Sequence, residues 1–407
     1  MRSIAHNAFT VAAFALTAAS AFAQAAEPWQ RHAVDDSSRG ADGVRLADFN
    51  GDGRMDIATG WEEGGVVRMY LHPGKQRVKQ PWPRVTVGEV RSAEDAVPVD
   101  LDGDSAIDIV SSCEGRTRTV YVHWAPKDKA KQLDSAAWKT EAIPASSGRH
   151  LWMFAVPLQI DGKHGIDLVV GTKGGEGGVG CFFTPENPRD LGGWRFELIH
   201  RMGWIMSLQA QDISGNGHAD ILISNRHGPN RGVHWIENIG SSADEAIEFK
   251  DWPLRRIDAG NREVMFLARG NVSGGARPDV LTAVKGRGLH LRSSPKDFRQ
   301  TPWLAAEIDL PADIGTGKGV AIGDVDLDGA VDIVFSCENA HGQRSGVRWL
   351  SLDEKTNRWR DHEISGPQGV KFDRIELLDL DEDGDLDVLT CEERANLGVM
   401  WYENPTT

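Results

Sequence analysis

Four oxygen-bearing side chains along residues 48–56 are spaced in a pattern that suits a metal ion. Asp48, Asn50, Asp52 and Asp56 occupy positions 1, 3, 5 and 9 of the segment DFNGDGRMD, and the apolar run IATGW follows. A backbone that curls around an ion brings such side chains together, and calcium takes about six to eight oxygen ligands. The closing acid stands at position 9 and strand-forming residues follow it, so the segment differs from an EF-hand. We therefore predict a calcium-binding turn between two β-strands.

The same acidic turn recurs six more times, at intervals of 52 to 59 residues. Three of these copies have a carboxylate at all four positions: Asp100, Asp102, Asp104 and Asp108; Asp324, Asp326, Asp328 and Asp332; and Asp379, Asp381, Asp383 and Asp387. We expect about four structural calcium ions, one for each complete copy, because the cations offset carboxylate repulsion and couple binding to folding. The alternative is an Asx-rich hairpin turn that binds no metal.

The third, fourth and fifth copies have lost ligands. The third has Lys163 at position 5, where an ammonium group repels a cation, and the fifth keeps Asp279 as its only carboxylate. We predict metal-free turns in these two copies. The fourth keeps Asp212 and Asp220 with Ser214 and Asn216 between them, which makes a weak site at best.

A second set of charged residues follows the acidic turns at a fixed distance. Six residues after each closing aspartate the seven copies carry Glu62, Glu114, Lys173, Arg226, Lys285, Glu338 and Glu393. Six residues before each turn they carry Asp42, Glu94, Met153, Met206, Met265, Lys318 and Asp373. In a closed ring the basic members would be neighbours and so would the acidic ones, so we predict a polarised ligand-binding pocket on the face opposite the acidic turns. The alternative is that two groups of units have diverged and that their charges form solvated salt bridges.

Three tryptophans fall near the same predicted face. Trp61, Trp152 and Trp204 lie outside the tryptophan positions that repeat along the chain. Indole rings there could stack on sugar faces or could pack around a central channel.

Seven repeated units must position these residues. Each unit reads as a short strand, the acidic turn, two further strands, and a fourth strand that starts with tryptophan, as in WPRVTV at residue 82. Four short β segments in each of seven copies indicate an all-β, seven-bladed β-propeller with four-stranded antiparallel blades. The chain ends after a third strand, while a spare strand begins at Trp29, so we expect the N-terminal strand to join the last blade and close the ring.

These repeats resemble the FG-GAP/VCBS repeat family, which is related to the calcium-bearing blades of the integrin α-subunit head. The resemblance implies a seven-bladed propeller with calcium in the D-x-D-x-D-G-x-x-D turns. It does not imply one activity, because similar proteins include adhesion modules, lectins, and sugar lyases or dehydratases.

The first residues indicate export. Arg2 precedes an apolar stretch, and Ala21-Phe22-Ala23 suits signal-peptide cleavage, so we interpret residues 1–23 as a signal peptide and residues 24–407 as one propeller domain. We expect a secreted or periplasmic protein, without a membrane span and monomeric. The net charge of −15 argues against nucleic-acid binding. The four cysteines are interpreted as buried thiols rather than a disulfide framework.

Three functions agree with these features. The first is an exported calcium-binding propeller that binds an extracellular ligand, such as an acidic glycan, opposite the calcium turns. The second is a polysaccharide lyase or sugar dehydratase that acts on acidic sugars, using the basic residues to neutralise a carboxylate and a His or Glu as base. The third is a scaffold that binds a protein partner.

Overall fold

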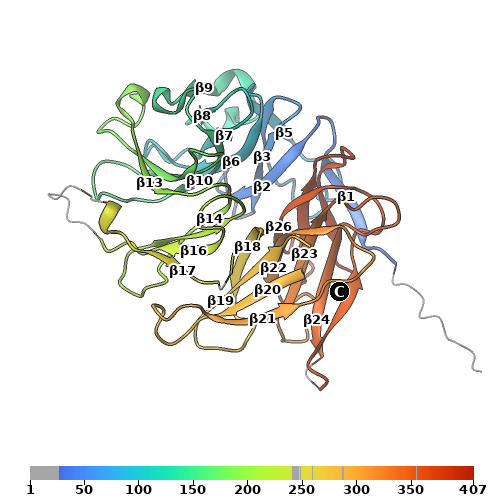
Figure 1. The fold of residues 1–407 in the computed structure, drawn as a ribbon. Coiled ribbons are helices and arrows are strands. Elements are labelled where there is room, and N and C mark those ends of the chain that lie inside the picture. Colours follow the sequence, from blue (N-terminus) through green and yellow to red (C-terminus); the bar gives the residue numbers. More distant parts are fainter. Residues whose placement is uncertain (1–26, 241–246, 248, 259, 287, 354) are drawn as a thin grey trace, which may run out of the picture.

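Seven small sheets are arranged around a central axis in the computed structural model (Figure 1), which describes residues 27–240, 247, 249–258, 260–286, 288–353 and 355–407. The predicted signal peptide, residues 1–23, lies outside the described residues. Each sheet is a four-stranded antiparallel blade. The predicted fold class, a seven-bladed β-propeller, is confirmed.

The blades follow one another along the chain. Blade 1 contains β2 (Ala41–Ala47), β3 (Asp56–Trp61), β4 (Val66–Tyr70) and β5 (Arg84–Gly88); blade 2 contains β6 (Ala93–Val99), β7 (Asp108–Cys113), β8 (Thr119–Trp124) and β9 (Lys139–Ala142); blade 3 contains β10 (Leu151–Pro157), β11 (Leu168–Lys173), β12 (Gly178–Phe183) and β13 (Arg195–Arg201); and blade 4 contains β14 (Ile205–Gln211), β15 (Asp220–Asn225), β16 (Gly232–Ile236) and β17 (Leu254–Arg256).

The other three blades have the same order. Blade 5 contains β18 (Val264–Gly270), β19 (Asp279–Val284), β20 (Gly288–Ser293) and β21 (Leu304–Ile308); blade 6 contains β22 (Thr316–Gly323), β23 (Asp332–Glu338), β24 (Val347–Asp353) and β25 (Arg358–Glu363); and blade 7 contains β26 (Phe372–Leu378), β27 (Asp387–Glu392), β28 (Gly398–Glu403) and β1 (Gln30–Asp35). Single turns of 3-10 helix lie in loops at Lys129–Lys131, Ser135–Ala137, Pro144–Ser146, Leu191–Gly193 and Phe249–Asp251.

Burial changes from the axis outward within each blade. The second strands β3, β7, β15, β19 and β27 are buried at every residue, because neighbouring blades cover both of their faces. The outer strand β21 is exposed at four of its five residues. The hydrophobic core therefore lies between the blades, and the inner and second strands are held firmly enough to position side chains at the axis.

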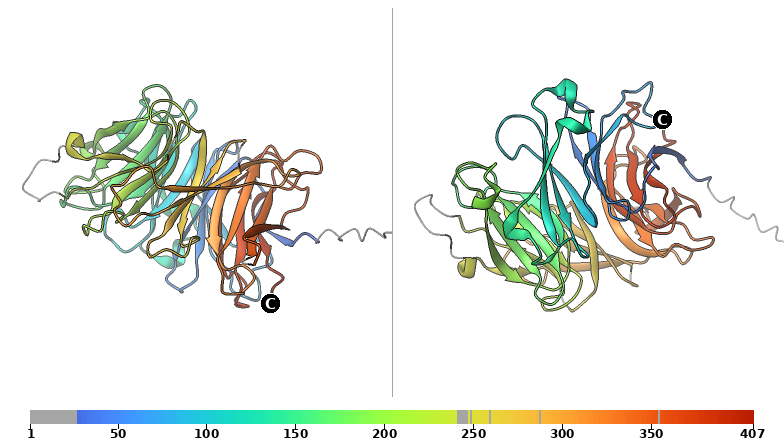
Figure 2. Two further views of the ribbon diagram at one scale, coloured as in Figure 1. Left: turned by 60° about the horizontal axis from the view of Figure 1, so that its bottom comes forward. Right: turned by 90° about the horizontal axis from the view of Figure 1, so that it is seen from above.

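The N-terminal strand closes the ring, as the sequence predicted. Strand β1 pairs with β28, from Gln30 opposite Glu403 to Asp35 opposite Val399. Figure 2 shows the blue N-terminal strand beside the red strands of the last blade. A backbone hydrogen bond just before β1 adds to this closure: the main-chain N–H of Trp29 donates to the carbonyl of Ile364 over 2.9 Å.

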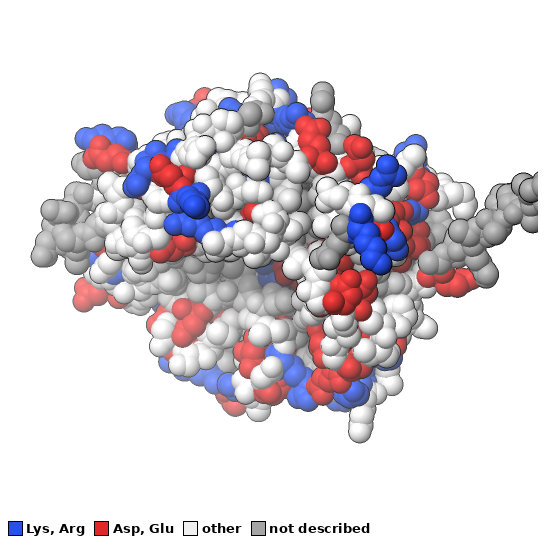
Figure 3. Space-filling view, turned by 90° about the horizontal axis from the view of Figure 1, so that it is seen from below, with Lys and Arg blue, Asp and Glu red and all other residues white. Residues whose placement is uncertain are grey.

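The surface and the thiols complete the description. The four cysteines are free and buried, as the sequence indicated. Figure 3 shows acidic and basic side chains interspersed over one side of the molecule. Among the described residues, no helix has the length and apolar character needed to cross a membrane.

Candidate functional site

The inner strands define two ends of the propeller axis. In each inner strand, the residue six positions before the acidic turn is the second or third of the strand. The strand then runs directly into that turn. The acidic turns and the starts of the inner strands therefore lie at opposite ends of the blades.

A β-bulge interrupts every inner strand close to its start. In six blades the register shift spans the residue six positions before the acidic turn, for example Glu94 in β6 and Met153 in β10. In blade 1 the shift lies just after Asp42. Bulges bend a strand and re-aim its side chains. Here they occur where the inner strands meet the axial cavity.

An axial cavity of about 350 Å³ lies at this end of the propeller, and all seven blades contribute to its wall. Five of the predicted ligand-binding residues line it: Glu62, Glu114, Lys173, Arg226 and Glu338. Lys285 and Glu393 are outside the lining, and each is paired with a neighbour, Lys285 with Glu263 over 3.1 Å and Glu393 with Lys371. Five of the seven charged positions thus gather around one pocket, and the other two lie outside its lining.

The basic side of the pocket is built around Trp204. The Lys173 Nζ lies 4.8 Å and the Arg226 Cζ 4.5 Å from the centre of the indole ring. The main-chain N–H of Arg226 also donates to the main-chain carbonyl of Trp204 over 2.7 Å. Lys173 is paired with Glu114, and the Arg226 Nε donates to Glu263 over 2.7 Å. Both cations therefore have a carboxylate partner and also lie against the indole ring.

The expectation for the other two tryptophans needs correction. Trp61 and Trp152 are both 0 % exposed, so neither can stack on a ligand. The Trp61 indole N–H donates to the Tyr70 hydroxyl over 2.8 Å, and that of Trp152 donates to the Ser146 carbonyl over 3.2 Å. Both rings pack between blades, so they neither stack on a ligand nor surround a central channel.

Several residues of the pocket escaped the sequence analysis. Lys371 and Arg394 line the cavity, and Glu263 supports Arg226 from outside the lining. Trp204, Glu263 and Lys371 lie in blades 4, 5 and 7. Each stands two residues before the residue that precedes its acidic turn by six positions. That aligned position was the signal that could have found them.

Buried charges of the pocket hold one another in defined protonation states. Lys318 and Asp373 form an ion pair of 2.5 Å, with side chains that are 6 % and 3 % exposed. Burial acts to raise the pKa of Asp373, but attraction by Lys318 and Lys371 and a hydrogen bond with Asp42 together outweigh it and lower the pKa to about 2. Burial and the neighbouring Asp373 raise the pKa of Asp42 well above its usual range, and burial raises that of Glu94 to about 7.

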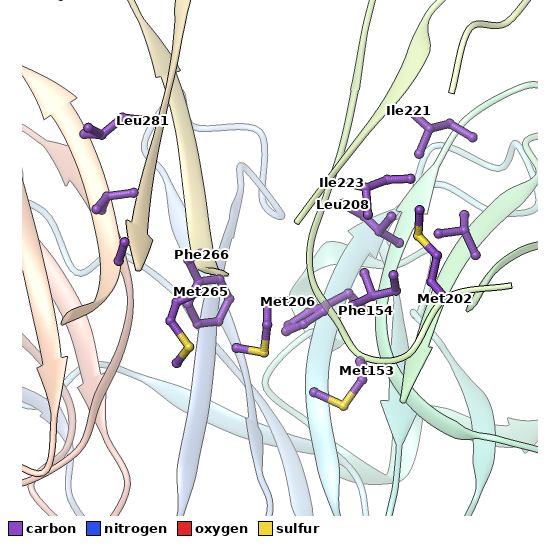
Figure 4. Packing of buried hydrophobic residues seen from close by; sticks show 14 of the residues in the cluster. Met153, Phe154, Met202, Met206, Leu208, Ile221, Ile223, Met265, Phe266 and Leu281 are labelled. Carbon is purple, nitrogen blue, oxygen red and sulfur yellow. The ribbon is translucent and has the colours of Figure 1, made fainter. Parts of the chain in front are cut away.

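A second cavity, of about 520 Å³, lies along the same axis toward the acidic turns. Phe266 lines both cavities, and its ring meets that of Phe154 edge to face at 5.8 Å. Figure 4 shows Phe154, Met206 and Phe266 pointing toward one another from three blades. These apolar side chains therefore lie between the charged pocket and the second cavity.

Three of the complete acidic turns bring carboxylates together in the way that a cation requires. Within each of the following sets the carboxylate oxygens lie within 4.8 Å of one another: Asp100, Asp102 and Asp108; Asp324, Asp326 and Asp332; and Asp379, Asp381 and Asp387. One oxygen of Asp324 and one of Asp381 are buried without a hydrogen-bond partner among the described residues. A calcium ion would satisfy both, so these residues fit the predicted ion.

The first acidic turn is arranged somewhat differently. Asp48 accepts hydrogen bonds from the N–H groups of Gly51, Asp52 and Gly53 over 2.7–3.0 Å. Asn50 replaces one carboxylate there, so the turn has fewer negative charges to place around a cation. Asp104, Asp328 and Asp383, at position 5 of the other complete turns, also stand outside the close sets.

The closing aspartate has a role in every blade, whether or not the turn is complete. All seven accept a hydrogen bond from the N–H of position 2 over 2.8–3.2 Å. In five blades the same carboxylate also accepts one from the backbone N–H one or two residues after the third strand, such as that of His72 to Asp56 over 2.7 Å. This carboxylate closes the turn even in blades 3 and 5, and in blade 3 it also fixes the hairpin to the segment after the third strand.

Side-chain amides replace the first carboxylate in the incomplete turns of blades 3 and 5. The Gln159 Nε2 donates to the Lys163 carbonyl over 2.9 Å, and the Asn271 Nδ2 donates to the Gly275 carbonyl over 2.9 Å. An amide can donate as well as accept, whereas an aspartate can only accept. These turns are therefore closed by their own hydrogen bonds and need no cation.

Comparison with known proteins agrees with this geometry. Residues 48–111 match the model of the FG-GAP-like repeat. The protein carries FG-GAP-like repeats. The matched segment runs from the first acidic turn into β7, the strand after the second, and so covers one full period of the FG-GAP-like pattern. No curated protein sequence matches the chain.

Solved structures resemble this chain at low sequence identity. BBS1N, in complex with ARL6DN, has a TM-score of 0.52 at 11 % identity, over 93 % of this chain and 98 % of that one. Sqt1 of Saccharomyces cerevisiae has a TM-score of 0.49 at 11 % identity, over 93 % and 98 % of the two chains. An Agrocybe aegerita lectin that recognises terminal N-acetylglucosamine has a TM-score of 0.44 at 14 % identity, over 81 % and 80 %. At these identities the likeness concerns the fold alone.

Proposed function

We propose that the protein is an exported, calcium-stabilised propeller that binds an extracellular ligand in its axial pocket. The observation that carries this proposal is the cavity of about 350 Å³, which lies at the axis and is lined by charged side chains from most of the blades. Its volume suits a small molecule or the end of a larger chain, and a few convergent polar groups in such a cavity fix a ligand's orientation.

Calcium would act on the scaffold rather than on the ligand in this proposal. The acidic turns lie at the opposite end of the blades from the pocket. Three of them gather carboxylates, and in two of these, those of blades 6 and 7, a buried carboxylate oxygen lacks a hydrogen-bond partner among the described residues. Cations bound there would tie each hairpin and would add to the stability of the folded state by mass action.

The ligand that fits the pocket best is the end of a glycan that carries an anionic group. Glu62, Glu114 and Glu338 can accept hydrogen bonds from sugar hydroxyls. Arg226 and Arg394 can donate to a carboxylate or sulfate, and a guanidinium can grip such a group in two places. Arg394 is exposed and forms no ion pair with a described residue, which leaves it free to do so.

Glycan binding by the calcium-loaded protein tests the proposal. We expect wild type to retain glycans that end in a uronic acid or a sulfated sugar and to pass over their neutral counterparts. Arg226→Gln should weaken this binding about 10- to 100-fold, since hydrogen bonds to a charged group contribute about 1.5–3 kcal/mol. The fold should tolerate the change, because Glu263 keeps Lys285 as a partner.

Arg195→Gln is the matched control, because Arg195 lies on the outer strand β13, away from the pocket. It should bind as wild type does. Absence of acidic-glycan binding by wild type, or equal binding by Arg226→Gln, would refute the proposed ligand class.

One observation favours an enzyme as the second candidate. Glu94 lines the pocket with a pKa raised by burial to about 7, which suits a general acid or base. A lyase acting on a uronate would pair such a group with Lys173 or Arg226 at the substrate carboxylate. Release of unsaturated, ultraviolet-absorbing products from uronate polymers would support a lyase. If no such products form, the ligand-binding function is favoured.

A further inference from the structure

Three carboxylates of the axial pocket lie together on one side. One oxygen from each of Asp42, Glu62 and Glu94 lies within 4.8 Å of the other two. Asp42 and Glu94 come from the inner strands of blades 1 and 2, and Glu62 follows the last residue of β3. All three line the cavity. They stand apart from the acidic turns, which lie at the other end of the blades.

The lysines of the pocket are already paired with other carboxylates. The pairs are Lys173 with Glu114, Lys318 with Asp373, and Lys371 with Glu393. Within the described part of the chain, no ion pair reaches Asp42, Glu62 or Glu94. Glu62 and Glu94 therefore have no ion-pair partner among the described residues, whereas Asp42 is attracted by Lys318 and shares a side-chain hydrogen bond with Asp373.

Burial makes this arrangement costly unless something balances it. Asp42 is 7 % and Glu94 is 9 % exposed. Glu94 forms no hydrogen bond through its carboxylate with any described residue, although that carboxylate lines the cavity. An isolated buried carboxylate costs several kcal/mol, and neighbouring like charges add to the cost. Two things can balance these charges. One is protonation, which the raised pKa values of Asp42 and Glu94 favour, and the other is a bound cation.

We propose that Asp42, Glu62 and Glu94 form a divalent-cation site in the axial pocket, separate from the calcium turns. Oxygen ligands alone, with carboxylates among them, suit a hard ion such as calcium, magnesium or manganese. A bound ion would join blades 1 and 2 at the axis. Its remaining coordination positions would face the cavity, where oxygen atoms of a ligand can reach them. The site goes beyond the proposed function and does not depend on the identity of the ligand.

Counting bound ions tests the site directly. Equilibrium dialysis with calcium, followed by elemental analysis, gives the number of ions per chain. We expect the double variant Asp42→Asn/Glu94→Gln to bind one ion fewer than wild type. Glu338→Gln, which removes a different carboxylate from the same pocket, should bind as many as wild type. Equal ion counts for wild type and the double variant would overturn the proposal, and because the comparison is a difference, the occupancy of the acidic turns does not affect it.

A second measurement places the ion and needs no variant. Wild-type crystals soaked in manganese should show an anomalous-scattering peak among the oxygens of Asp42, Glu62 and Glu94. Peaks confined to the acidic turns would overturn the proposal even if the double variant does not fold. A double variant that is more stable than wild type in saturating calcium would also overturn it, because it would show that protons rather than a cation balance these carboxylates.

Discussion

The ion pair between Arg45 and Asp95 should be one of the strongest single contributors to the stability of the ring. Two parallel hydrogen bonds join them, from Arg45 Nε over 2.7 Å and from Nη2 over 2.8 Å. Asp95 also accepts from the N–H groups of Ala96 and Ala155, over 3.1 and 3.2 Å. One carboxylate therefore links blades 1, 2 and 3 beside the second axial cavity.

The expected effect follows from what each substitution leaves behind. The side chains of Arg45 and Asp95 are 14 % and 3 % exposed, and removing one partner of a buried pair costs about 3–5 kcal/mol. Arg45→Met should lie near the lower figure, because Asp95 keeps two backbone donors and the positive charge of Arg374 is nearby. Asp95→Ala should lie near the upper figure, because Arg45 loses its acceptor and two N–H groups lose theirs.

Urea unfolding at neutral pH in saturating calcium, followed by tryptophan fluorescence, measures these changes. In a double-mutant cycle with Arg45→Met and Asp95→Asn, the two losses should overlap by about 2 kcal/mol, because groups in one hydrogen-bonded pair are not additive. Lys139→Met is the control, since the Lys139 and Glu141 side chains are 69 % and 36 % exposed, and it should change the stability by no more than about 0.5 kcal/mol. A loss below about 1 kcal/mol for Arg45→Met, or additive losses, would refute the reasoning.

Three other predictions concern the turns, the closure and a buried histidine. Chelation should lower the melting temperature by several degrees and Asp381→Ala should remove one bound ion, whereas identical melting curves with calcium and with chelator would contradict structural calcium. Deletion of residues 27–36 removes β1 and exposes the edge of β28, so we expect aggregation or a large loss of stability by light scattering and urea unfolding, and a soluble, equally stable product would contradict this. Burial lowers the pKa of His123 to about 3, so the unfolded chain binds more protons between about pH 6.5 and 3, and stability should fall by up to about 1.4 kcal/mol per pH unit as the pH decreases through that window. His123→Gln should lose this dependence in urea titrations at pH 7.5 and 5, and an unchanged slope would count against it.

The repeat pattern predicts the architecture well because its signals are local. Each acidic turn, with its closing aspartate, marks one hairpin, and the tryptophan before each outer strand marks the end of a unit. Counting these signals gives seven blades and shows that the Trp29 strand belongs to the last one. The hydrogen bonds that hold each hairpin join residues fewer than about twenty positions apart in the sequence, such as Asp56 and His72.

The pocket is less predictable because its geometry depends on the bulges. A strand alternates its side chains between two faces, but the register shift in each inner strand breaks this alternation near the axis. Sequence position alone therefore does not show that Trp152 turns into the core while Trp204 lines the cavity. It also does not show that the Lys285 side chain pairs with Glu263, its neighbour at the ends of the paired strands β18 and β19 of blade 5, instead of lining the pocket.

The bulges also separate the chemistry of the pocket from the stability of the blades. The closing aspartates hold the hairpins at one end, and blade 3 keeps the hairpin of its turn with Gln159 in place of the first carboxylate. At the other end, the residue six positions before each turn is an acid in blades 1, 2 and 7, a methionine in blades 3, 4 and 5, and a lysine in blade 6, and all of these except Met265 line the axial cavity. Since these seven residues share a backbone setting but not a chemistry, the same blade accepts a charge or a thioether at the axis. The composition of the pocket can therefore change by single substitutions while the acidic turns continue to hold the scaffold that positions it.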